Sequence, residues 1–118
     1  MDNFTRRLVA IVSVTDGDTF KANPDLGYHV VLQEIIYRVA RINCPEKRSK
    51  DPVVKAAAWA AQDFTTKWLF EHMEHKGIFV TSNKTDDWQR YLAEVDCGLG
   101  HNLADDLLSS GNAVLYKK

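Results

Sequence analysis

The sequence predicts an α+β fold, in which five strands form a small, partly open barrel, with one long helix inserted before the fourth strand and one short helix near the C-terminus. Three observations predict it. The first half of the chain holds segments rich in Val and Ile, a long amphipathic stretch follows, and two more strand-like segments come after it. Short, twisted strands in this number close naturally into a barrel. A split two-layer sandwich would give a similar pattern.

The first strand is expected over residues 8–14, where apolar residues occupy both faces. Asp16-Gly17 follows, and Asp-Gly is a strong hairpin signal because glycine accepts the positive φ that a tight turn demands. A second strand then begins at Thr19 and Phe20. The start of the chain therefore predicts a β-hairpin.

A second turn is expected at residues 23–27, where Asn, Pro, Asp and Gly gather. After it, residues 29–36 and 38–42 predict one long strand or two bent strands. Pro45 ends them. These segments supply the remaining strands of the first half.

The long helix begins at Asp51-Pro52, because a carboxylate N-cap followed by proline is a helix start. It is expected to run to about residues 72–75, and Gly77 stops it. One apolar stripe recurs at steps of three and four residues and comprises Val54, Ala57, Ala58, Ala61, Phe64, Trp68 and Leu69. We expect Trp59 and Trp68, on or near this stripe, to serve packing rather than base stacking.

The last third of the chain predicts strands over residues 78–81 and 90–95, separated by a polar loop. A short helix over residues 102–110 ends at Gly111. Residues 114–116 form a final extended segment.

The composition is that of an ordinary globular protein, with 118 residues, 45% hydrophobic and 26% charged. We expect one domain over residues 1–118, since two cores would each be too small. Disorder, collagen-like repeats and a disulfide miniprotein are excluded, and no apolar run reaches the roughly 20 residues that cross a bilayer. Without a signal-like apolar segment, the expected location is cytoplasmic, or secreted if a leader is missing. Cys44 and Cys97 are expected to be free thiols.

Charge is balanced overall, with a net charge of −1, so a global basic field for nucleic acid is absent. Residues 38–50 nevertheless hold five bases and one acid, and residues 86–106 hold six acids and one arginine. This distribution predicts a positive side and a negative side of the molecule. Two ordinary solvated faces are the alternative.

Three segments contain polar residues that a simple core does not require. They are Asp-Gly-Asp-Thr-Phe at 16–20, Arg-Val-Ala-Arg-Ile-Asn-Cys-Pro-Glu at 38–46 and Lys-Thr-Asp-Asp-Trp-Gln-Arg at 84–90. Each has an ordinary explanation alone: a hairpin turn, a strand with outward arginines, and a surface loop. Together, in this order and with a helix starting just after the second, they resemble the staphylococcal nuclease (thermonuclease) family over roughly residues 11–116.

The resemblance implies an OB-fold barrel carrying helices, and hydrolysis of DNA and RNA with Ca²⁺. It places Asp18 at the family's first metal carboxylate and Cys44 where a backbone carbonyl reaches the metal. Asn43 stands where the family commonly has a second carboxylate. Its amide oxygen can still bind Ca²⁺, but the lost charge predicts a weaker site.

The resemblance also assigns catalytic and substrate-binding positions. Arg38 and Arg90 match its two phosphate-binding arginines, and Glu46 matches the carboxylate that activates or positions water. Trp88 falls where the family places an aromatic near the substrate, and Tyr116 would be a second aromatic, near the nucleoside. The family's usual lysine near the substrate is replaced by Asp87, and Lys84 or Lys50 could substitute for it.

The chemistry of these residue types agrees with that assignment. Two guanidinium groups offer fixed donor forks for phosphoryl oxygens. A hard cation held by oxygen ligands acts as a Lewis acid. A carboxylate that activates water adds roughly 10²–10⁴-fold to the rate. We therefore expect a calcium-dependent, sugar-nonspecific endonuclease that favours single-stranded DNA and RNA and has no membrane partner. The alternatives are a catalytically weakened OB-type module that binds nucleic acid or protein, and a structural domain without a ligand.

Overall fold

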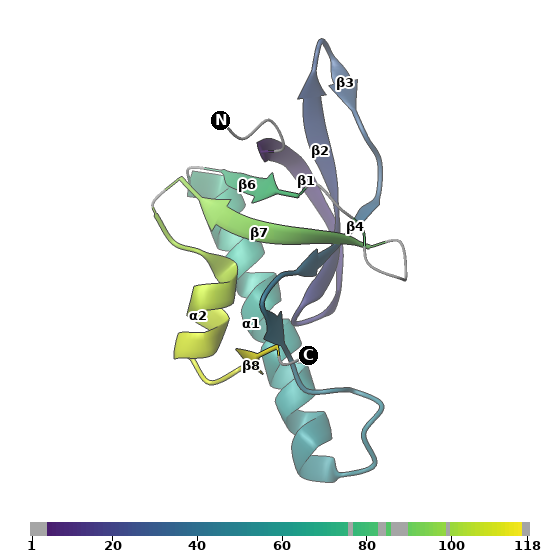
Figure 1. The fold of residues 1–118 in the computed structure, drawn as a ribbon, viewed down its shortest axis with the longest axis vertical. Helices are drawn as coiled ribbons and strands as arrows, with labels where there is room; N and C mark the ends of the chain where they lie inside the picture. Colours follow the sequence, from purple (N-terminus) through teal and green to yellow (C-terminus); the bar gives the residue numbers. More distant parts are fainter. Residues whose placement is uncertain (1–4, 76, 83–84, 86–89, 99, 117–118) are drawn as a thin grey trace.

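A computed structural model describes residues 5–75, 77–82, 85, 90–98 and 100–116. Its elements are, in chain order, β1 (Thr5–Asp16), β2 (Thr19–Gly27), β3 (Val30–Val31), β4 (Ile35–Val39), β5 (Ile42–Asn43), α1 (Pro52–His75), β6 (Ile78–Thr81), β7 (Tyr91–Cys97), α2 (Leu103–Ser109) and β8 (Val114–Leu115) (Figure 1). The predicted α+β class is confirmed.

Five strands close into a mixed barrel in the order β1-β6-β7-β4-β2, and pairing of β2 with β1 completes the ring. The β4–β7 pair is parallel, and the other pairs of the ring are antiparallel. β1 can belong to both ends of the sheet because its first residues pair with β6, while residues 8–16 pair with β2 through several register shifts. Such irregularities bend a strand, which closure of a small barrel requires.

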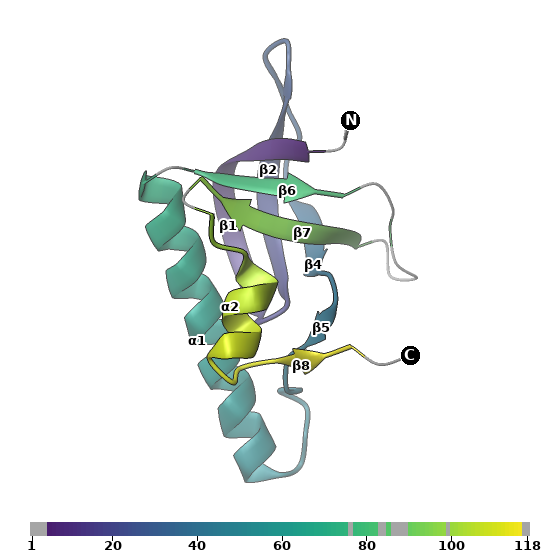
Figure 2. The same cartoon turned by 60° about the vertical axis from the view of Figure 1, so that its left-hand side comes forward.

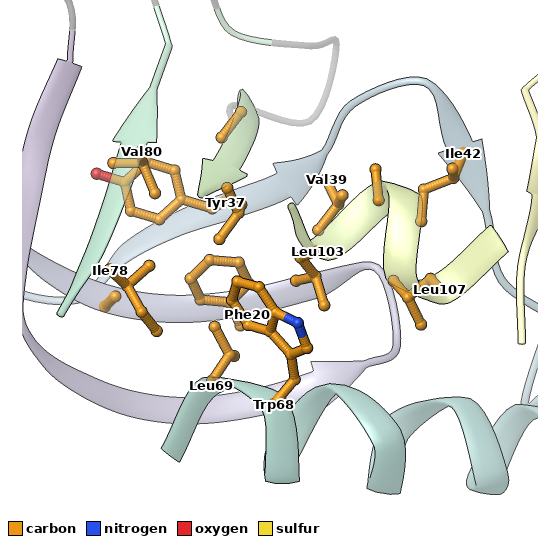
Figure 3. Packing of buried hydrophobic residues seen from close by; sticks show 14 of the residues in the cluster. Phe20, Tyr37, Val39, Ile42, Trp68, Leu69, Ile78, Val80, Leu103 and Leu107 are labelled. Carbon is orange, nitrogen blue, oxygen red and sulfur yellow. The ribbon is translucent and has the colours of Figure 1, made fainter. Parts of the chain in front are cut away.

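The core fills the barrel and continues to the two helices that cover it (Figure 3). Phe20 and Tyr37 face each other inside the barrel, with ring centroids 5.6 Å apart. Trp68 and Leu69 of α1 close one side, and Leu103 of α2 lies beside them. The polar edge of Trp68 is satisfied because its Nε1–H donates to Asp106 Oδ2 at 2.7 Å, as a buried indole requires.

The start and stop signals of α1 are confirmed. Asp51 Oδ1 accepts a hydrogen bond from Val53 N at 2.9 Å, and Gly77 takes a φ of +86° just beyond the helix. The first half of α1 extends past the barrel (Figure 1), and there Trp59 is 51% exposed. Trp68 packs in the core, whereas Trp59 lies outside it. Neither helix, within the part of the chain that the structure describes, is long and apolar enough to cross a membrane.

The turn predicted at residues 23–27 is also wrong. β2 runs through Pro24 to Gly27, and the chain reverses at Tyr28 and His29, which both have positive φ. Pro24 faces Leu8 in the ladder, and its carbonyl accepts from Leu32 N at 3.1 Å. Pairing on both sides of the strand outweighs the local turn preference.

The predicted positive and negative sides of the molecule are not separate at Arg41, where the basic segment over residues 38–50 contacts the acidic segment over residues 86–106. The guanidinium of Arg41 donates to Glu94 at 2.7 and 2.8 Å and to Asp105 at 3.2 Å. The hydrogen bond from Arg41 holds the pKa of the Glu94 carboxyl below its usual range. A basic residue of the first segment is thus joined to two acids of the second. Figure 2 shows why: β5, which follows Arg41, lies beside β8 and close to α2.

Gly17 has a different role from the one that the sequence predicts. The positive-φ glycines are Gly27, Gly77, Gly100 and Gly111, and Gly17 is not one of them. Instead, a Cβ at position 17 would lie 2.8 Å from both Ala61 Cβ and Cys44 Sγ. The carbonyl of Gly17 accepts from Thr65 Oγ1 at 2.6 Å. The missing side chain lets the β1–β2 hairpin press directly against α1.

A Gly17→Ala variant should therefore lose about 1–3 kcal/mol of unfolding free energy, the usual cost of overpacking. Urea denaturation followed by circular dichroism measures the loss. Glycine at position 61 is itself destabilising inside α1, so the comparison is made in the Ala61→Gly background, where Gly17→Ala should cost less than it does in the wild type. Equal midpoints for Gly17→Ala and the wild type would contradict the close-approach explanation.

Candidate active site

Asp18 is held at the tip of the β1–β2 hairpin by contacts from both sides. Its backbone carbonyl accepts from Val39 N at 2.8 Å. Its carboxylate accepts from Thr19 Oγ1 at 3.1 Å through Oδ1 and from Cys44 N at 3.0 Å through Oδ2. The hairpin seated on α1 thus presents one carboxylate to the ends of β4 and β5.

Arg38, near the end of β4, meets that carboxylate. Its Nη2 lies 3.5 Å from Asp18 Oδ2 and donates to Asn43 Oδ1 at 2.5 Å, and its Nη1 donates to the Val39 carbonyl at 2.6 Å. The side chains of Arg38 and Asp18 are only 11% and 14% exposed. A guanidinium so buried needs such partners, because an uncompensated charge there would be strongly destabilising.

Cys44 lies at the back of this cluster as a protonated thiol. Burial, and secondarily the negative charge of Asp18, raise the pKa of its thiol to about 12. A thiol with so high a pKa supplies no thiolate at neutral pH. Its side chain therefore packs against the hairpin, while its backbone N–H fixes Asp18.

The oxygen atoms of the cluster suit a cation that prefers oxygen ligands, and these ligands together carry little negative charge. Asp18 Oδ2 and Asn43 Oδ1 both approach the same nitrogen of Arg38, so two hard oxygens already face one positive charge. Ca²⁺ prefers such carboxylate and amide oxygens. Within the described residues, no group of three or more His, Cys, Asp or Glu could hold a metal. Any cation here would rely on Asp18, the Asn43 amide and backbone carbonyls.

Arg90 directly precedes β7, the strand that pairs with β4, and Arg38 lies on β4. Tyr37 pairs with Tyr91 in the parallel β4–β7 ladder. Arg38 follows Tyr37 in β4, so alternation puts it on the opposite face of the sheet from Tyr37. Arg90 is partly buried. It stands two residues before Leu92, the partner of Arg38 in the ladder.

Glu46 is exposed in the loop that joins β5 to α1. Its backbone carbonyl accepts from Ser49 N at 3.2 Å, which shapes the loop as a turn. It follows Cys44 by two residues, and Cys44 N is bonded to Asp18. Along the chain, Glu46 is thus two residues from the cluster, and its side chain is open to solvent.

Of the positions expected to contact substrate, the structure describes Lys50 and Tyr116. Trp88 and Asp87 fall outside the described residues. Lys50 is exposed just before α1. Tyr116, 55% exposed, donates its backbone N–H to the Arg41 carbonyl at 2.7 Å, so it lies toward the end of β5 that is farther from Cys44.

The sequence suggests either a solvated loop or a phosphate-tracking role for Lys47, and the structure gives it other contacts. Its Nζ donates to the Thr15 carbonyl at 2.5 Å, lies 3.7 Å from Asp16 Oδ1, and stands 4.4 Å from the centroid of the Trp59 ring. The only signal in the sequence is its place directly after Glu46. Its partners come from β1 and α1 and are visible only once the chain is folded.

The family model described as "Staphylococcal nuclease homologue" matches residues 37–118. The match includes Arg38, Asn43, Cys44, Glu46 and Arg90, whereas the hairpin that carries Asp18 precedes it. A search of curated proteins found no match.

Proposed function

Since the chain belongs to the staphylococcal nuclease homologues, we propose that it is a Ca²⁺-dependent endonuclease that hydrolyses DNA and RNA phosphodiesters with little sequence reading. Membership in the family implies a nuclease-like function and a nucleic-acid substrate. The observation that carries the finer proposal is the cluster of Asp18, Arg38, Asn43 and Cys44. Three separate segments bring these residues into mutual contact.

In the proposed reaction, each residue of the site has a separate role. Asp18, the Asn43 amide and the Cys44 carbonyl would hold the cation, which when bound supplies Lewis-acid stabilisation to the phosphoryl oxygens. Arg38 turns its fork from Asn43 to the phosphate, and Arg90 donates from the neighbouring strand. Glu46 orients and deprotonates the attacking water.

Recognition rests on the phosphates and on unstacked bases. Phosphate contacts carry no sequence information, and stacking on an aromatic ring accepts every base. Trp88, Lys50 and Tyr116 are the positions proposed for these contacts. Single-stranded or frayed substrates should therefore be cut faster than intact duplex.

The direct test is degradation of plasmid DNA, a single-stranded oligonucleotide and RNA in Ca²⁺, Mg²⁺, Mn²⁺ or EDTA. We expect cutting in millimolar Ca²⁺ and none in EDTA.

The ligand set itself favours a second candidate function. Asn43 stands where the family commonly has a carboxylate, and the Arg38 guanidinium contacts the side-chain oxygens of both Asp18 and Asn43. That candidate is a catalytically weakened OB-type module that binds nucleic acid or protein. Nucleic acid that is bound equally well in EDTA and never cut would establish it.

Asn43→Asp should tighten Ca²⁺ binding by about tenfold or more, because ligand charge tunes calcium affinity over several orders of magnitude. A calcium titration of cleavage rate, together with calorimetry on the free protein, measures the change. Asn23→Asp adds the same charge on β2 and keeps the acceptor that Glu34 N uses, so it serves as the control. Equal calcium affinity in Asn43→Asp and the wild type would remove Asn43 from the ligand set.

A further inference from the structure

The loop that carries Glu46 is attached to the rest of the molecule on both sides of that residue. On one side, Cys44 N donates to Asp18 Oδ2 at 3.0 Å. On the other, Lys47 Nζ donates to the Thr15 carbonyl at 2.5 Å and lies 3.7 Å from Asp16 Oδ1. Both attachments lead to the same hairpin, over residues 15–18.

Lys47 is also held by the helix. Its ammonium lies over the Trp59 ring, 4.4 Å from the centroid, and its side chain is 24% exposed. An ammonium has three donors and no acceptor, and a carbonyl, a carboxylate and an aromatic face suit that chemistry. A cation–π contact of this kind contributes to holding the side chain in place.

We propose that Lys47 is a positioning residue that fixes the Glu46 loop to the hairpin bearing Asp18. The proposal rests on the function proposed above, since it gives Glu46 a place relative to the reacting phosphate. Between the two attachments lie Pro45, whose φ is restricted, and Glu46 itself. With Lys47 released, the loop would be tied at one side only, and a displacement of about 1 Å in a reacting group can cost about 10²-fold in rate.

A direct phosphate contact is the other role open to a lysine beside Glu46. The contacts of Lys47 argue against it, because its ammonium is already bonded to a carbonyl and lies near a carboxylate. A phosphate-binding lysine would act mainly on KM. A positioning lysine acts on kcat, so steady-state kinetics separate the two roles.

The test compares Lys47→Met, Lys47→Arg and the control Lys67→Met, in the full chain, on a fluorescent single-stranded oligonucleotide in Ca²⁺. Lys67 is exposed on α1. We expect kcat of Lys47→Met to fall about 10- to 100-fold, with KM within about threefold of wild type and circular dichroism unchanged. Lys47→Arg should recover most of the rate, since a guanidinium can donate to the Thr15 carbonyl and lie over Trp59. An unchanged kcat, or a rise in KM alone, would overturn the proposal.

A second measurement does not depend on nuclease activity. Glu-C protease cuts after glutamate, and Glu46 is exposed. Release of the loop in Lys47→Met should speed cleavage at Glu46 about tenfold, because local opening limits proteolysis, and Lys67→Met should match wild type. If the wild type cuts no nucleic acid, the proposed function fails, and this assay alone decides whether Lys47 holds the loop. Equal cleavage at Glu46 in Lys47→Met and wild type would mean that it does not.

Discussion

An Arg38→Lys variant is expected to lose about 10²- to 10³-fold in kcat, the usual effect of removing one preorganised donor to a developing negative charge. The guanidinium of Arg38 is nearly buried and already uses both terminal nitrogens, one toward Val39 and one toward Asp18 and Asn43. Lysine keeps the charge but has a single donor centre, so it cannot hold the cluster and contact two phosphoryl oxygens at once.

Steady-state cleavage of a single-stranded oligonucleotide in Ca²⁺ measures this loss. Arg41→Lys is the matched control, because Arg41 also makes forked contacts, with Glu94 and Asp105, but belongs to the surface beside α2. It should keep wild-type kcat. If both variants lose the same activity, the effect of Arg38→Lys reflects general destabilisation rather than a lost phosphate donor.

Glu46→Gln should abolish cutting almost completely, with a loss of about 10²–10⁴-fold in kcat, because an amide cannot take the proton of the attacking water. Binding of nucleic acid should remain within a few-fold of wild type. Glu46 is exposed, and its backbone carbonyl shapes the loop through Ser49 N, so a side-chain change of equal size should leave the fold intact.

Fluorescence anisotropy with a labelled oligonucleotide separates binding from cleavage in this variant. Glu71→Gln, on the exposed face of α1, makes the same change away from the cluster and should cut like wild type. Wild-type cleavage by Glu46→Gln would exclude Glu46 as the catalytic carboxylate. A lost circular dichroism signal would instead make Glu46 a structural residue.

The helices were predictable because their signals are local. Asp51 caps α1, Gly77 follows its end, and Asn102 caps α2 by accepting from Asp105 N at 3.1 Å. Each signal acts within about one helical turn of the residue that gives it. The same holds for β6, whose predicted bounds at residues 78–81 are those of the structure.

The errors fall where distant segments meet. Pro24 and its neighbours favour a turn in isolation, yet pairing with β1 and β3 keeps them in β2. Gly17 was assigned to turn geometry, whereas contact with Ala61 and Cys44 requires it. Trp59 lies near the helical stripe, but α1 extends beyond the barrel there and leaves Trp59 51% exposed.

For this protein, the amino-acid sequence by itself determined the two helices, the α+β class and the family to which the chain belongs, because capping, periodicity and ordered motifs are readable over a few neighbouring residues. Only the tertiary structure decided that Asp18, Arg38 and Asn43 touch, and that Lys47 ties the loop of Glu46 to the hairpin. These contacts join residues far apart in the chain, and their geometry exists only after the barrel closes and α1 packs against it.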